Sequence, residues 1–414
     1  MKRCMMSSLQ TRNAPSDFRV RPAGPVLIVT PWYRPAVGGV ARVAERLRDG
    51  LSEADVQTHL MVCDGMSSHS RVEQVSGENN VWRFGAPSGA FYRLSLKSVA
   101  GTMARGLSAF ARLRRFAGTH GIRAVILIYP CGYQWPFLLL RRTAGLCLIA
   151  SYHGSEVRHH HRNTAMWRWL ARRTLRSSDA VVVCDAALGG RVQELLPGVP
   201  LPIWLIPNGV DVQYFCPPRT FRRSNGRPTL VHVSNFAPTK RTLDIIEAFA
   251  FAALPSASRL VMVGAGPDLP QAINRVRDLG IQNRVEFVGA VDDVRRHLWG
   301  ADLFVLASDE ESCPLALLEA MACGLPWIAS PCGVAASLPA GECGLLVPPR
   351  SPRRLAAAMA ELMSDPRRRR LMALRASRRA RSDFQEDTYV QRHLELIRVV
   401  QSGAPVPSGV PALT

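Results

Sequence analysis

The sequence contains no apolar run as long as the roughly 18 residues that a membrane-spanning helix needs. The longest candidate, from Phe137 to Ala150, is interrupted by Arg141 and Arg142. The first 25 residues are polar and contain proline, so they also lack the apolar centre of a signal peptide. These absences predict a cytoplasmic protein in which residues 1–24 form a disordered tail.

Paired cysteines and regular groups of metal ligands are also lacking. The ten cysteines are scattered without a Cys-x-x-Cys pair, and Cys147, Cys184 and Cys323 lie in apolar stretches, where a thiol behaves as a small hydrophobic group. The consecutive histidines His159 to His161 cannot all face one point on a helix. No Asp-x-Asp pair is placed to hold a divalent ion. We therefore expect neither a disulfide framework nor a metal site.

Acidic residues are scarce relative to basic ones, 32 against 52, and the imbalance is concentrated in one region. Between Val81 and Arg176 there are 16 basic residues and a single acid, Glu156. Such a surface suits an anionic membrane or another anionic partner, and a genomic preference for arginine is the alternative. The helical pattern over 91–116 is basic and amphipathic, which fits either core packing or a membrane-surface helix. No basic motif has interleaved aromatic residues, so we expect no nucleic-acid binding.

Short apolar runs alternate with helical patterns along the whole chain, which predicts parallel α/β sheets. The 414 residues are enough for two domains, and the alternation restarts after a Pro- and Arg-rich segment over 217–228. The predicted strands are 26–30, 58–62, 124–129, 147–150, 180–184, 229–233, 260–263, 285–287, 303–307 and 327–329.

The stretch that follows the predicted strand over 303–307 contains the residues with the clearest chemical roles. Ser312 precedes a helical pattern with Leu315 and Leu318 on one face, so a helix N-terminus points back over an acidic loop. Free N–H groups and the helix dipole make such a place attractive to phosphate. Glu311 and Glu319 bracket the turn, and carboxylates accept hydrogen bonds from sugar hydroxyls. Alternatively, Glu311 caps the helix and Glu319 is a solvated helical residue.

Other loops at predicted strand ends also suit a phosphate. Gly38 and Gly39 precede a helical pattern, and glycine lets backbone N–H groups approach a ligand closely. Lys240 follows the strand over 229–233, at the edge where ligands enter an open α/β sheet. His153 comes soon after the strand that ends at Ala150.

These residues resemble the motifs of glycosyltransferase family 4, the retaining GT-B enzymes. Glu311 and Glu319, with the Ala-Met-Ala-Cys-Gly-Leu-Pro that follows, resemble its donor-sugar motif, and 35–42, 153–156 and 205–211 resemble its other strings. The likeness covers roughly 26–400. Asn235 stands where the family has arginine, and Arg241 is a candidate replacement for that charge. The string over 234–241 resembles the subgroup that glucosaminylates malate.

The resemblance implies two Rossmann-like domains facing a cleft, over 25–213 and 214–383, a helix over 384–400 that crosses back to the first domain, and a disordered tail over 401–414. It also implies retaining transfer of a sugar from a nucleotide-diphosphate sugar to an acceptor hydroxyl, in cell-surface polysaccharide or glycolipid synthesis, without a metal or resident cofactor. The acceptor would be a carbohydrate or lipid-linked molecule, reached from the inner face of the plasma membrane. The implied catalytic residues are His153, Lys240 and Glu311, and the implied donor-binding residues are Gly38, Gly39, Asn235, Arg241, Gly264, Gly266, Ser312, Cys313, Pro314, Leu315 and Glu319.

Three other hypotheses stay open at this point. An NDP-sugar epimerase shares the GT-B architecture. A donor-binding but inactive paralogue is suggested by Asn235, and a nucleic-acid-binding protein only by the total charge.

Overall fold

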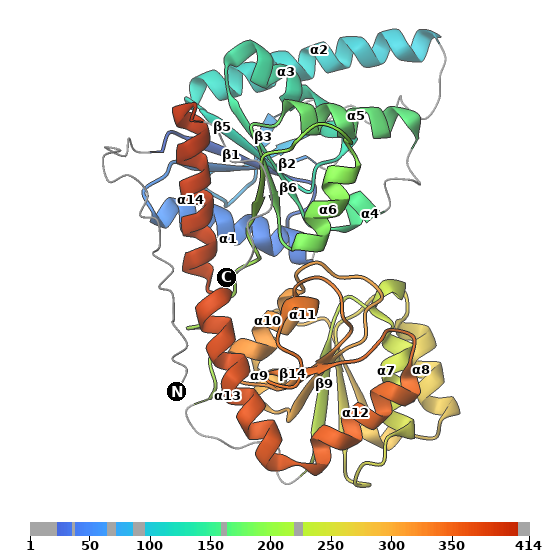
Figure 1. Cartoon of the computed structure of the whole chain (residues 1–414). Helices are drawn as coiled ribbons and strands as arrows, with labels where there is room; N and C mark the ends of the chain where they lie inside the picture. Colours follow the sequence, from blue (N-terminus) through green and yellow to red (C-terminus); the bar gives the residue numbers. More distant parts are fainter. Residues whose placement is uncertain are drawn as a thin grey trace, which may run out of the picture.

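The computed structural model describes residues 23–34, 38–63, 72–85, 96–158, 164–218 and 227–404. They form two α/β domains, each with a sheet covered by helices (Figure 1). This arrangement confirms the predicted fold class. Several segments with sequence predictions lie outside the described part of the chain: residues 1–22 of the tail predicted over 1–24, the loop 35–37, residues 91–95 of the predicted basic helix, the histidines at 159–161, residues 219–226 of the linker and the last ten residues.

The first domain is organised around an eight-stranded sheet with the order β3-β4-β2-β1-β5-β6-β7-β8. Neighbouring strands are parallel except β3 and β4, which pair antiparallel. Most of its strands are continuous apolar runs, because helices cover both faces of the sheet. The strands are β1 (Val26–Thr30), β2 (Thr58–Val62), β3 (Val72–Gln74), β4 (Val81–Phe84), β5 (Ala124–Ile128), β6 (Cys147–Tyr152), β7 (Ala180–Val183) and β8 (Ile203–Leu205).

The helices of this domain present apolar stripes to the sheet. In α1, Val43, Leu47 and Leu51 are buried, as their spacing predicts. The basic segment predicted to be helical is α2, which buries Leu113 and Phe116 against β2 and β5, whereas Leu107 is 64% exposed. The helices are α1 (Gly39–Glu53), α2 (Leu96–Thr119), η1 (Gly132–Gln134), α3 (Trp135–Ala144), α4 (Ser155–Arg158), α5 (Ala165–Ser177) and α6 (Ala186–Glu194).

The second domain has a six-stranded, fully parallel sheet with the order β11-β10-β9-β12-β13-β14. In both sheets the chain order reverses, beside β1 in the first and beside β9 in the second. A crevice opens at such a point outside the carboxyl ends of the strands. The strands are β9 (Thr229–Val233), β10 (Arg259–Val263), β11 (Val285–Gly289), β12 (Leu303–Leu306), β13 (Trp327–Ala329) and β14 (Gly344–Leu346).

One helix of the second domain, α9, begins shortly after the acidic pair Asp292–Asp293. The Asp293 carboxylate accepts a hydrogen bond from the backbone N–H of Arg295, the first residue of α9, at 3.0 Å. The helices are η3 (Pro238–Lys240), α7 (Thr242–Phe251), α8 (Leu269–Asp278), η4 (Gln282–Arg284), α9 (Arg295–Trp299), α10 (Leu315–Ala322), α11 (Val334–Ser337), α12 (Pro352–Ser364) and α13 (Pro366–Asp383).

The last helix, α14 (Glu386–Ser402), returns to the first domain and packs along α1 (Figure 1). Tyr389, Leu394 and Ile397 join the core beneath β1. Where α14 begins, the chain pairs with the segment that leaves the first domain, through a bridge between Val210 and Gln385. The helix runs to Ser402, so it takes in the start of the segment predicted to be a tail. No helix in the described residues has the length and apolar character needed to cross a bilayer.

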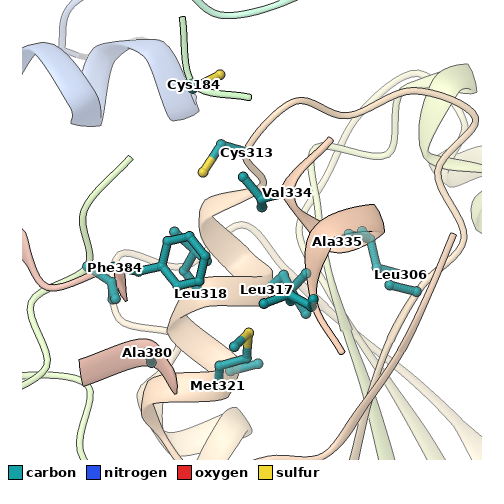
Figure 2. Close-up of a cluster of buried hydrophobic side chains, with 14 of the residues drawn as sticks. Cys184, Leu306, Cys313, Leu317, Leu318, Met321, Val334, Ala335, Ala380 and Phe384 are labelled. Atoms are coloured by element: carbon teal, nitrogen blue, oxygen red, sulfur yellow. The ribbon is translucent and has the colours of Figure 1, made fainter. Parts of the chain in front are cut away.

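One hydrophobic core continues from one domain into the other around α10. Figure 2 shows Leu317, Leu318 and Met321 of this helix among side chains of α11 and α13, with Cys184 of the first domain nearby. Because α10 is buried on nearly all sides, its position and the direction of its N-terminus are fixed.

Candidate active site

A cleft of about 480 Å³ lies between the two domains. Its walls include the segments that follow β6, β9, β10, β11 and β12, and the N-terminal ends of α1 and α10. The cleft therefore lies where the strand order of both sheets predicts a ligand site. Most of the residues predicted from the sequence line it: Gly38, Gly39, His153, Asn235, Lys240, Gly264, Glu311, Ser312, Cys313, Pro314, Leu315 and Glu319.

Two predicted donor-binding residues are not among those that line the cleft. Arg241 donates to both carboxylate oxygens of Asp244, at 3.0 and 2.7 Å, and lies 4.0 Å from Asp309. Gly266 supports the loop that carries Asn235, because a Cβ there would come within 1.8 Å of the Asn235 carbonyl oxygen. The charge that Arg241 carries is thus neutralised outside the cleft.

Lys240 and Glu311 form an ion pair inside the cleft. The Nζ of Lys240 donates to Glu311 Oε1, which also accepts from the Ser308 hydroxyl at 3.1 Å. The loops that carry the pair are tied together by a hydrogen bond of 2.8 Å from the Asp309 N–H to the Thr239 carbonyl. Since an ammonium has three donors, Lys240 keeps donors for a further acceptor while it holds Glu311.

Glu319 is enclosed by the first domain, although it belongs to a helix of the second. Its side chain is 2% exposed, and Oε1 lies 3.5 Å from both Arg42 Nη1 and Arg46 Nη2 of α1. Burial raises the pKa of the Glu319 carboxyl, and the two guanidinium groups oppose that shift. The alternative of a solvated helical residue is therefore wrong.

His153 and Glu156 form the turn between β6 and α4. The Glu156 carboxylate accepts from the backbone N–H of His153, and the ring Nε2 of His153 lies 3.1 Å from the Ser151 hydroxyl. Burial lowers the pKa of His153 to about 4, so its imidazole is neutral at neutral pH. Burial also raises the pKa of Glu156 to about 7. The structure thus gives Glu156 a place in holding this turn.

The sequence did not indicate two arginines that line the cleft, Arg42 and Arg158. Arg158, the last residue of α4, donates from Nη2 to the hydroxyl of Ser312 at 2.5 Å, across the domain interface. The Asn208 amide also crosses it, donating to the Cys313 carbonyl at 3.0 Å. The one signal was position, since Arg42 ends the string over 35–42 that resembles the family, and Arg158 lies two residues beyond the string over 153–156. The described residues contain no cluster of three His, Cys, Asp or Glu side chains placed as metal ligands.

Two sheets of this topology with a cleft between them define the GT-B fold. The structure superposes on sucrose-phosphate synthase from Thermosynechococcus elongatus with a TM-score of 0.75 and 19% identity, covering 92% of this chain and 100% of that one. Residues 37–214 match the model of Glycosyltransferase Family 4, and residues 227–365 match that of Glycosyl transferases group 1.

Curated relatives agree with these matches. The chain is 30% identical over 348 residues to the GDP-mannose-dependent alpha-(1-6)-phosphatidylinositol monomannoside mannosyltransferase of Mycobacterium tuberculosis, covering 76% of this chain and 85% of that enzyme. The protein belongs to glycosyltransferase family 4. It is also 33% identical over 171 residues to the N-acetyl-alpha-D-glucosaminyl L-malate synthase of Bacillus anthracis, a match to 41% of this chain and 45% of that enzyme.

Proposed function

We propose that the protein transfers a sugar from a nucleotide-diphosphate sugar to an acceptor hydroxyl, with retention of configuration at the anomeric carbon and without a metal ion. The observation that carries this proposal is the pairing of Lys240 with Glu311 in a cleft that also contains the Gly38–Gly39 turn. Departure of a nucleoside diphosphate places negative charge on its phosphate oxygens, which nearby fixed cations and N–H donors stabilise. Lys240, the glycine turn and the N-terminus of α10 supply those groups.

The remaining roles follow from the hydrogen-bonding atoms that each side chain has available for a ligand. Glu311 keeps one carboxylate oxygen, Oε2, for the hydroxyls of the donor sugar, while Oε1 is taken by Lys240 and Ser308. Neutral His153 lies against the sugar on the side of the first domain. Glu319 would accept from the ribose. The proposed retaining transfer would not pass through a covalent enzyme intermediate, because Glu319 is buried between two arginines and Glu311 is bound by Lys240. The acceptor hydroxyl would then attack the anomeric carbon from the same face as the leaving group, as the bond from that carbon to the phosphate oxygen breaks and the departing phosphate takes the hydroxyl proton.

The acceptor class is proposed from the surface of the first domain. α2, α3 and α5 lie together at the end of that domain remote from the second (Figure 1). They expose Leu107, Leu139, Met166 and Trp169 among arginines. We call these helices the basic helical surface. Apolar side chains among cations are typical of proteins that dock on anionic lipid. The mannosyltransferase relative acts on a phosphatidylinositol monomannoside, so a lipid-linked acceptor and a role in cell-surface glycolipid or polysaccharide synthesis fit this surface.

Turnover of a panel of UDP-, GDP- and ADP-sugars by the purified protein tests the proposal. We expect release of nucleoside diphosphate from one donor class, equal rates with and without EDTA, and a product with the donor's anomeric configuration by NMR. Inhibition by EDTA that magnesium or manganese reverses would refute the metal-independent mechanism. Donor binding without turnover of any sugar would favour the inactive paralogue that Asn235 suggests.

A further inference from the structure

The cations that line the described part of the cleft differ in how well their charge is compensated. Lys240 is bound to Glu311, and Arg42 lies 3.5 Å from the buried Glu319. Arg158, in contrast, makes its short contact with the neutral hydroxyl of Ser312, at 2.5 Å. Its carboxylate partner, Glu310, lies 3.7 Å away and is 42% exposed. Arg158 therefore has the longest ion-pair contact of the three, and the Glu156 and Asp185 carboxyls within its electrostatic range have pKa values that burial raises.

This long ion-pair contact matters because Arg158 is nearly buried. Its side chain is 8% exposed, and its Nε has no hydrogen-bond partner. A buried guanidinium with an unsatisfied donor loses hydration that a neutral hydroxyl does not replace. An anion in the cleft would compensate the charge of the guanidinium, and arginine binds phosphate through two parallel N–H···O bonds.

The surrounding backbone leaves room for the guanidinium at this place. Gly154 has a φ of 132°, and a Cβ on it would lie 2.0 Å from Arg158 Nη2 and 2.6 Å from Ser312 Oγ. A side chain here would push the guanidinium away from the second domain. Glycine at position 154 thus keeps Arg158 in contact with the loop that carries Glu311.

We propose that Arg158 binds the sugar-bearing phosphate of the donor and supplies the positive charge that Asn235 does not. This inference rests on the proposed function. Arg158 contacts Glu310 and Ser312, the two neighbours of Glu311, so it lies beside the residue that would orient the sugar. Arg241 does not compensate for Asn235, because its guanidinium is bound by Asp244. The diphosphate is then held from both domains, by Arg158 of the first and Lys240 of the second.

The test compares the affinities of nucleoside diphosphates and monophosphates by calorimetry. UDP and UMP, GDP and GMP, and ADP and AMP are measured with the wild-type protein, and the pair with the tightest diphosphate is kept. Arg158→Gln should weaken diphosphate binding about tenfold to a hundredfold, the range for a charged hydrogen bond, and should change monophosphate binding little. Arg241→Gln is the matched control and should leave both affinities unchanged.

Each of the following outcomes would overturn the inference. A wild-type protein with no preference for any diphosphate would contradict the proposed function as well. If Arg158→Gln keeps the wild-type preference and only unfolds at a lower temperature, Arg158 is a contact between domains and not a phosphate ligand. Loss of the preference in Arg241→Gln instead would assign the charge to Arg241. If Arg158→Gln does not fold, Arg158→Lys is measured in its place. Lysine cannot form the two parallel bonds, so the preference for the diphosphate over the monophosphate should fall severalfold. An unchanged preference in Arg158→Lys would refute the inference.

Discussion

Replacement of Lys240 by alanine removes the cation that we place against the departing diphosphate. Glu311 fixes the ammonium before the donor binds, so the ammonium can stabilise the leaving group without moving. The substitution removes that preorganised contact. Loss of one such preorganised group lowers turnover about 10²-fold, or about 2.7 kcal/mol in activation free energy. Stability should change less, because the Lys240 side chain is 21% exposed and water partly solvates the carboxylate that remains. We expect Lys240→Ala to lower the free energy of unfolding by about 1–3 kcal/mol.

The assay separates these two effects. Turnover is the rate of nucleoside diphosphate release at saturating donor, and stability is measured by urea unfolding. A double variant, Lys240→Ala with Glu311→Gln, removes the unpaired carboxylate, so it should recover stability while turnover stays low. Arg350→Ala is the matched control, since it breaks a neighbouring ion pair with Asp309 whose arginine is 70% exposed and lies outside the cleft.

Turnover of Lys240→Ala within a few-fold of the wild-type rate, in a folded protein, would refute the assignment of Lys240 to the leaving group. Recovery of turnover in the double variant would be equally damaging, because it would show that the single variant suffers from an unpaired Glu311 and not from a missing cation.

Two further predictions concern the surface and the buried histidines. The protein should sediment with anionic but not with neutral vesicles at low salt, and it should dissociate from them at high salt, where surface charges are screened. Trp169→Ala and Arg172→Glu should each weaken this binding. Equal, negligible binding to both vesicle types would leave the basic helical surface without a lipid partner. Burial lowers the pKa values of His153, His232 and His393 from 6.5 to about 4. Between those pH values the unfolded chain therefore binds more protons than the folded protein. The free energy of unfolding should fall as pH falls from 6.5 to 4, by on the order of 3 kcal/mol per histidine. Urea unfolding of the wild-type protein and of His232→Asn at pH 7.5 and pH 5 checks this. The comparison with the variant is needed because the raised pKa of Glu156 acts in the opposite direction over this range. A pH dependence in His232→Asn equal to that of the wild-type protein would contradict the burial of the His232 ring.

The sequence alone was sufficient to predict the two-domain α/β fold, because buried parallel strands appear in a sequence as continuous apolar runs. Val26–Thr30, Thr58–Val62, Thr229–Val233 and Trp327–Ala329 have the bounds that were predicted. The strands that the sequence did not indicate are β3, β4, β8 and β14. They are short and lie at or next to the edges of the sheets, where partly exposed side chains interrupt the apolar pattern.

Some residues of the candidate site could be predicted from the local sequence, whereas others are brought together only by contacts between distant segments. Lys240 and Glu311 could be predicted because each follows its own strand, and parallel strands bring their carboxyl ends to one edge. The pairings of Arg158 with Ser312 and of Glu319 with Arg42 join residues more than 150 positions apart in the sequence. No periodicity or spacing encodes such contacts, since they depend on how one domain sits against the other. Which arginine faces the cleft, and which is neutralised outside it, was decided by the tertiary structure alone.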